Sequence, residues 1–140
     1  MTTYEQLLAD CIRWAKEAGR IQLELFRSDR LDIEAKFNDS DVVTNADKAS
    51  EKAIISEIRR AYPEHSVLSE EAGCDKRMND WLWVIDPLDG TTNYSSGLPN
   101  FCVSIGVQHK GQTVVGVVYA PYLGEIFTAV RGKGAFLNNR

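Results

Sequence analysis

The stretch WVIDPLDGTTNY, residues 83–94, ends an apolar run with two aspartates that stand three positions apart. Asp86 and Asp89 flank a proline and a leucine, and Gly90 follows with two threonines. Proline and glycine are enough to make a turn, so a turn does not need two carboxylates. The segment is therefore either an ordinary loop, such as a type I turn with Asp86 at its first position, or a site for a divalent cation.

Length and composition indicate one globular domain over residues 1–140, with a net charge of −4 and 44% apolar residues. No block of Lys and Arg could follow a nucleic-acid backbone, so we expect no nucleic-acid partner. No signal peptide and no apolar run of the ~20 residues that span a bilayer is present, so we expect no membrane partner and a cytoplasmic location. Cys11, Cys74 and Cys102 lack zinc-ligand spacing and are expected to be reduced, non-catalytic thiols.

The N-terminal part of the sequence predicts a long helix and then a small β-structure. Apolar residues recur at helical spacing over Leu7–Phe26, behind Thr2 or Thr3 as a cap. Residues 31–47 contain short alternating pieces around the Asn-Asp-Ser-Asp sequence at 38–41. This pattern predicts a β-hairpin or two short strands.

A second helix is expected to begin at Thr44 or Asn45 and to end at Pro63. Its buried stripe is predicted from apolar spacing alone and consists of Ala49, Ala53, Ile54 and Ile58.

The rest of the chain predicts strands. Residues 65–71 look like a short strand that runs into acidic residues, and 72–80 like a polar loop. Residues 81–85 are too continuously apolar for a half-exposed strand, so they should lie centrally in a sheet. Residues 101–139 predict three or four antiparallel strands with glycine turns. Helices early and strands later favour an α+β (mixed αβ) fold, with two long helices packed on a largely antiparallel sheet.

Acidic residues stand at the ends of several expected elements: Asp47 at the second helix, Glu70 and Glu71 after a strand, and Asp86 and Asp89 after the next. Carboxylates at the ends of neighbouring strands can meet in one cleft. Left unpaired there, like charges ~4 Å apart repel by several kcal/mol at an intermediate dielectric. A hard cation such as Mg²⁺, which prefers oxygen ligands, would reverse the sign of that energy.

Each acidic residue also has a purely structural interpretation. Asp47 stands three residues after Thr44, where it can complete a capping box at the start of the second helix. Glu70 and Glu71 could form a solvated acidic turn. The metal-site interpretation therefore depends on these residues coming together.

The motifs closely resemble those of the inositol monophosphatase family, a group of Mg²⁺-dependent, lithium-sensitive phosphomonoesterases. Residues 83–94 are similar to its Asp-Pro-Xaa-Asp-Gly-Thr-Xaa-Asn signature. DVVTNADKASE at 41–51 resembles the segment before its first metal ligand, and YPEHSVLSEEAG at 62–73 its Glu-Glu element. The resemblance runs along the whole chain and implies the N-terminal half of the layered αβαβα sugar-phosphatase fold.

The resemblance implies a metal-ligand set. Glu70, the Asp86 carboxylate and the Leu88 backbone carbonyl would bind one Mg²⁺. Asp86 would bridge to a second Mg²⁺, which Asp89 also binds. A complete family member holds two or three such ions.

The resemblance also implies catalytic and substrate-binding residues. Asp47 and Thr91 would orient and activate the water that attacks phosphorus. The backbone amides of Gly90, Thr91 and Thr92 would hold phosphate oxygens at the start of a short helix, where free N–H groups favour anions.

The activity that the resemblance implies is hydrolysis of inositol monophosphate, or of a similar small polyol phosphate, by a protein that forms a homodimer. Related branches cleave 3′-phosphonucleotides, fructose bisphosphate or histidinol phosphate. GTTNYSSGLP at 90–99 is more similar to the inositol branch.

The sequence departs from the family in length. Family members are nearly twice as long, and their second half carries a Trp-Asp motif that completes the second metal site. Two interpretations follow. The chain is a fragment of such an enzyme, which we favour, or it is a half-length, catalytically silent metal-binding or interaction module.

Overall fold

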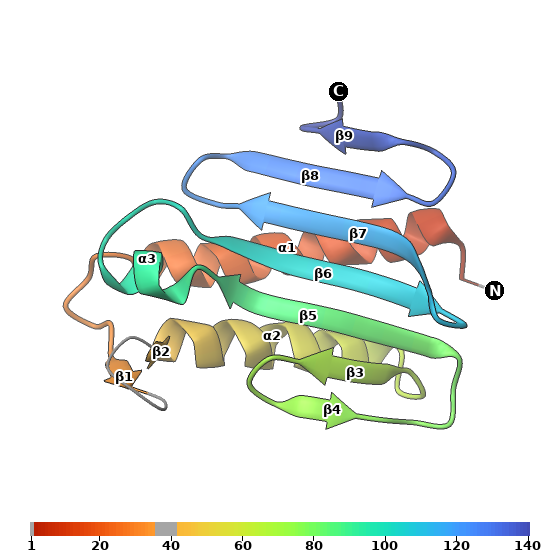
Figure 1. The fold of residues 1–140 in the computed structure, drawn as a ribbon, viewed down its shortest axis with the longest axis horizontal. Coiled ribbons are helices and arrows are strands. Elements are labelled where there is room, and N and C mark those ends of the chain that lie inside the picture. Colours follow the sequence, from red (N-terminus) through yellow and green to blue (C-terminus); the bar gives the residue numbers. More distant parts are fainter. Residues whose placement is uncertain (1, 36–41) are drawn as a thin grey trace.

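The computed structural model describes residues 2–35 and 42–140. Two helices, α1 (Tyr4–Leu25) and α2 (Asn45–Ala61), cover one face of a seven-stranded sheet (Figure 1). The strands of this sheet lie in the order β4-β3-β5-β6-β7-β8-β9, and every neighbouring pair is antiparallel except β3 and β5. The expected mixed α+β layering, with two long helices on a largely antiparallel sheet, is confirmed.

The elements of the sheet are β3 (Ser66–Ser69), β4 (Gly73–Asp75), β5 (Trp81–Asp89), β6 (Cys102–His109), β7 (Gln112–Ala120), β8 (Glu125–Val130) and β9 (Ala135–Leu137). A short helix, α3 (Thr91–Ser95), follows β5. The prediction of one polar loop over 72–80 is wrong at β4, whose side chains are all exposed. Its strand conformation comes from antiparallel pairing with β3, which a polarity pattern does not reveal.

The expected hairpin between the two helices is present as β1 (Ile33–Ala35) paired antiparallel with β2 (Val42–Thr44). The predicted turn at 38–41 lies outside the described residues. Among the helices of the described ranges, none combines the length and the apolar character that crossing a bilayer requires.

Both long helices begin with a capping box, in which the cap and the third helical residue exchange hydrogen bonds. Thr3 caps α1: its hydroxyl accepts from the Gln6 amide at 3.1 Å, and the Gln6 side chain accepts from the Thr3 amide at 2.7 Å. Thr44 and Asp47 form the same arrangement at the start of α2. The predicted start of each helix is therefore confirmed.

The buried stripe of α2 differs from the predicted one. The buried residues are Ala46, Asp47, Ser50, Ile54 and Ile58, whereas Ala49 and Ala53 are only partly buried. The prediction counted apolar residues alone. It is wrong at Ala49 and Ala53, because this part of the helix buries the polar side chains of Asp47 and Ser50 instead.

The hydrophobic core fills the space between the two helices and the sheet. Leu7, Cys11 and Trp14 of α1 pack there with Trp83 and Ile85 of β5. As predicted, β5 is an inner strand, paired with β3 on one side and β6 on the other. Its burial nevertheless alternates along the strand. The residues between the buried ones are partly buried, because both long helices lie on the same face.

The sheet face that points away from α1 and α2, called the open face below, carries exposed apolar side chains. Phe127 is 43% exposed, and its directly opposite neighbours on β7 and β9, Val118 and Leu137, are 37% and 38% exposed. A hollow of about 300 Å³ lies beside them, lined in part by Gly106 and Gly116. A contiguous apolar patch of this kind tends to be covered in solution.

We expect the 140-residue chain to self-associate through the open face. Light scattering after size exclusion should give a mass above the monomer's 15.7 kDa, and the double substitution Val118→Lys and Phe127→Lys should shift it to the monomer value. Leu23→Lys is the matched control, since Leu23 is 41% exposed but lies on α1. A monomeric parent chain would show that the open face does not drive association.

Candidate metal and phosphate site

The site begins with a bulge in β5. Pairing with β6 runs to Asp86, opposite Ser104, and resumes at Asp89, opposite Cys102, so two residues of β5 oppose one of β6. Pro87 is one of the two, and it is tolerated there because a bulge leaves a backbone group without a ladder partner. The segment from Asp86 to Asp89 is thus a bulged strand, and the type I turn considered as an alternative is wrong.

Gly90 lets the chain leave the strand and start α3. Its φ is 87°, in the left-handed region, and a Cβ at this position would lie 2.7 Å from the carbonyl oxygen of Asn100. Any other residue would therefore be both strained and crowded. The result is a helix start placed directly beside the bulge.

The parallel pairing of β3 and β5 brings the acidic residues together. Ser69, the last residue of β3, is the Cα partner of Ile85, so Glu70 and Asp86 both follow at the same end of the sheet. The start of α2 and the whole of α3 lie at this end too (Figure 1). In open parallel sheets, ligands bind outside the carboxyl ends of the strands, and β3 and β5 are the one parallel pair among the described strands of this sheet.

A pocket of about 250 Å³ lies at this end of the sheet. It is lined by most of the predicted site residues, namely Glu70, Asp86, Leu88, Asp89, Gly90, Thr91 and Thr92, together with Val42 and Asn93. Of the predicted residues, Asp47 is absent from the lining, and it reaches the pocket through Thr91.

The Asp47 carboxylate accepts hydrogen bonds from two different parts of the chain. One carboxylate oxygen accepts from the backbone amide and the hydroxyl of Thr44, at 2.8 and 2.6 Å. The other accepts from the Thr91 hydroxyl at 2.8 Å. The capping interpretation is therefore confirmed, while a role of Asp47 in the site stays a prediction that the contact with Thr91 supports. Burial raises the pKa of Asp47, the hydrogen bonds from Thr44 and Thr91 oppose that rise, and the charge of Glu71 adds to it.

Among the site residues, Asp86 has the most strongly shifted pKa. Its pKa is raised to about 7, first by burial, then by the charge of Glu70 and a hydrogen bond with it, and then by the charge of Asp89. Within the described ranges, none of the three carboxylates forms an ion pair with a Lys or Arg. The site thus concentrates negative charge that the described residues leave unneutralised.

The chemistry of these donors suits a hard divalent cation, since carboxylate and carbonyl oxygens are what Mg²⁺ prefers. The described residues do not, however, gather three acidic, His or Cys side chains into a ready metal-binding group. Two carboxylates and one backbone carbonyl, with water and phosphate as further ligands, would still make a Mg²⁺ site.

Cys102 lies beside this site, with its sulfur 3.9 Å from a carboxylate oxygen of Asp89. Burial, and then the charges of Asp89 and Asp86, raise the pKa of this thiol to about 11. It therefore stays protonated at neutral pH and is a poor nucleophile there.

Sequence reasoning missed a buried glutamine that holds the bulge. Gln22 of α1 is fully buried, and its side-chain amide donates to the Pro87 carbonyl at 2.6 Å and to the Ser50 hydroxyl at 3.1 Å. The Tyr94 hydroxyl in turn donates to the backbone carbonyl of Gln22 at 2.7 Å. The available signal was positional: Gln22 stands four residues after the buried Ala18, where an apolar residue would be expected.

The raised pKa of Asp86 predicts a pH-dependent stability for the metal-free chain. A carboxyl group whose pKa is higher in the folded state contributes stability at low pH, and that contribution is lost as pH rises from about 4 through about 7. Asp86→Asn mimics the protonated form, so in chelator it should melt closest to wild type near pH 4 and well above wild type at pH 8. Asp80→Asn, an exposed control, should give no such divergence. If the melting temperatures of wild type and Asp86→Asn change with pH in the same way, the electrostatic crowding around Asp86 is contradicted.

Comparison with known proteins agrees with this geometry. The curated relative "Nus factor SuhB" of Pasteurella multocida is 50% identical over 135 residues, which cover 95% of this chain and 50% of the relative. The crystal structure of the extragenic suppressor protein suhB from Bartonella henselae superposes with a TM-score of 0.91 at 37% identity, covering 96% of this chain and 52% of that one. The chain thus spans about half the length of the curated relatives it matches.

A third match bears on the metal. The structure of an IMPase/NADP phosphatase complexed with Mg²⁺ and phosphate is 26% identical, with a TM-score of 0.86, and covers 99% of this chain and 53% of that one. The family model described as "Inositol monophosphatase family" matches residues 3–140. The chain therefore belongs to the inositol monophosphatase family.

Proposed function

We propose that residues 1–140 are the N-terminal, metal- and phosphate-binding half of a Mg²⁺-dependent phosphomonoesterase that hydrolyses inositol monophosphate or a similar small polyol phosphate. The observation that carries the proposal is the pocket at the carboxyl ends of β3 and β5. There Glu70, Asp86 and Asp89 meet the first turn of α3.

The proposed ligands follow from the oxygen donors in that pocket. Glu70, Asp86 and the Leu88 carbonyl would hold one Mg²⁺, while Asp86 and Asp89 would hold a second. Bound Mg²⁺ would neutralise the carboxylates, polarise the phosphoryl group and lower the pKa of coordinated water. A further ligand that completes the second site would come from the other half of a full-length protein.

Thr91 and Asp47 would orient the attacking water. The Thr91 hydroxyl has a single hydrogen, and its 2.8 Å contact directs that hydrogen to Asp47 rather than to the Leu88 carbonyl at 3.2 Å. The oxygen of Thr91 is then left as an acceptor for a proton of water. The raised pKa of Asp47 makes this carboxylate a stronger base than an exposed aspartate.

The backbone would hold the phosphate. The first N–H groups of α3, from Thr91 and Thr92, precede the first intrahelical hydrogen bonds, and they line the pocket beside Gly90. Hydrogen-bond donors at that point would bind phosphate oxygens after the carboxylates are neutralised. The pocket of about 250 Å³ would admit a phosphate group. Selection of the alcohol would depend mostly on the other half of a full-length protein.

A second candidate is a catalytically silent binding protein. The name "Nus factor" of the curated relatives and the open face of the sheet support such a role. The expected absence of a nucleic-acid partner remains a prediction, because it was based on charge alone. The two candidates differ in whether bound Mg²⁺ leads to turnover.

Calorimetric titration of this chain with Mg²⁺, paired with a phosphate-release assay, separates the two candidates. We expect Mg²⁺ to bind and to raise the melting temperature, with a stabilisation of about 1.4 kcal/mol at ten times the dissociation constant. Release of phosphate from inositol monophosphate would support the phosphatase. The turnover measurement uses a full-length form, because the second ion and the alcohol also need the other half. Mg²⁺ binding without turnover there would support the silent protein, and no Mg²⁺ binding would contradict the phosphatase.

The role of Thr91 can be tested in an active, full-length form. Thr91→Ala should lower kcat by about 10²-fold or more with little change in KM, because the hydroxyl acts on the water rather than on bound substrate. Thr91→Ser keeps the hydroxyl and should keep most of the activity. Equal losses in both variants would assign Thr91 a packing role instead.

A further inference from the structure

Glu70, one of the proposed metal ligands, lies at an exposed position. It opens the three-residue turn Glu70–Ala72 between β3 and β4, a turn closed by Gly73 with a φ of 76°. β4 is the edge strand of the sheet, and all of its side chains are exposed. A turn on an edge hairpin is among the more mobile parts of a fold unless other contacts hold it.

Glu51, on the second turn of α2, makes those contacts. A single oxygen of its carboxylate accepts from the Ser69 hydroxyl at 2.6 Å, from the Glu71 amide at 3.2 Å and from the Ala72 amide at 3.0 Å. These donors bracket Glu70 on both sides. Hydrogen bonds to a charged acceptor are about twice as strong as neutral ones.

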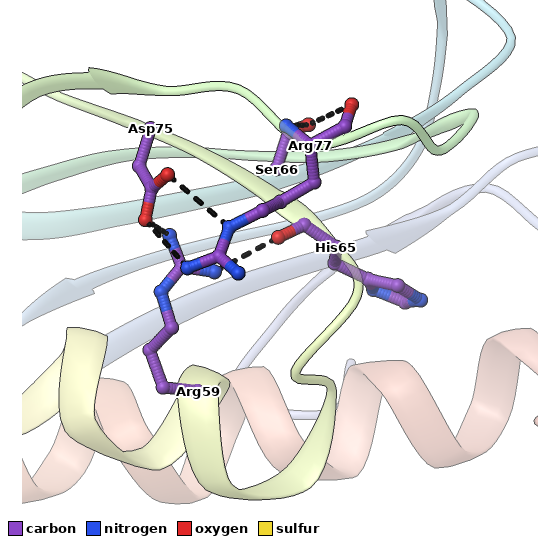
Figure 2. Close-up of polar contacts among 5 residues, drawn as sticks. All are labelled: Arg59, His65, Ser66, Asp75 and Arg77. Carbon is purple, nitrogen blue, oxygen red and sulfur yellow. Dashed lines mark hydrogen bonds and ion pairs between the residues drawn. The ribbon is translucent and has the colours of Figure 1, made fainter.

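The other end of the hairpin is fastened to the same helix. Figure 2 shows Arg59 of α2 and Arg77 converging on Asp75, the last residue of β4. Arg59 also donates to the His65 carbonyl at 2.9 Å, and the Arg77 amide donates to the Ser66 hydroxyl at 2.7 Å. This anchor lies at the open end of the hairpin, at the opposite end of β3 from Glu70, so it can hold the strands without fixing the turn.

We propose that Glu51 is a positioning residue that fixes the turn carrying Glu70 and thereby sets the affinity of the site for a divalent cation. The inference rests on the proposed metal site. A hydrophobic helix–sheet contact would hold β3 equally well, but it would not fix the backbone on both sides of one side chain. Outer contacts of this kind typically change metal affinity 10–100-fold.

Mg²⁺ calorimetry on the 140-residue chain tests the proposal without an activity assay. Glu51→Ala should weaken Mg²⁺ binding about tenfold or more, whereas Glu57→Ala should not. Glu57 is on the same helix and pairs with Arg60, away from the turn. Glu51→Gln keeps an oxygen acceptor, so it should bind within about threefold of wild type. A Gln variant as weak as the Ala variant would show that the charge, and not the positioning, matters.

A double-mutant cycle tests whether Glu51 acts through Glu70. In the Glu70→Gln background, Glu51→Ala should cost little further Mg²⁺ affinity. Additive losses would overturn the proposal. Arg59→Ala serves as a second control, since it should lower the melting temperature while leaving Mg²⁺ affinity near wild type.

Hydrogen exchange separates failure of this inference from failure of the proposed function. Without metal, the amides of Glu71 and Ala72 should be protected in wild type and in Glu51→Gln and should exchange at least tenfold faster in Glu51→Ala. Protected amides in a chain that binds no Mg²⁺ would refute the metal site but leave the turn-holding role intact. Unprotected amides in wild type would overturn the role of Glu51 itself.

Discussion

Electrostatic repulsion among three carboxylates is the constraint that shapes this fold at its functional end. The parallel pairing of β3 and β5 places Glu70 and Asp86 at the same end of the sheet, and the bulge adds Asp89. Burial and these like charges raise the pKa of Asp86 to about 7. The surrounding structure must hold such a cluster together, because the carboxylates repel one another.

The sheet keeps the three carboxylates together through its backbone geometry rather than through positively charged side chains. The bulge at Pro87 turns the end of β5 so that two carboxylates and a carbonyl line one pocket. Gly90 then starts α3 in a conformation that other residues disfavour. Gln22 reaches the Pro87 carbonyl from α1, so the bulge is tied to the helix layer that covers the core. Rigid backbone of this kind keeps repelling groups together until a cation binds.

The sequence predicted the parts of this arrangement that lie in local motifs. The capping box at Thr44 and Asp47, the inner position of β5 and the acidic residues at strand ends all follow from short-range patterns. Strand β4 and the contact of Gln22 were missed, because pairing with an edge strand and burial of an amide depend on distant segments. Periodicity likewise cannot say whether a second layer covers the open face.

Helix α2 buries polar residues in its first turns, where apolar ones were expected, because one face of the helix contacts the pocket. Asp47, Ser50 and Glu51 share that face at helical spacing, and they contact α3, Gln22 and the β3–β4 turn in that order. Further along the helix the same stripe continues as Ile54 and Ile58 and packs into the core. The stripe changes from polar to apolar where the helix leaves the pocket, so a single helix both covers the sheet and sets the relative positions of the site's separate parts.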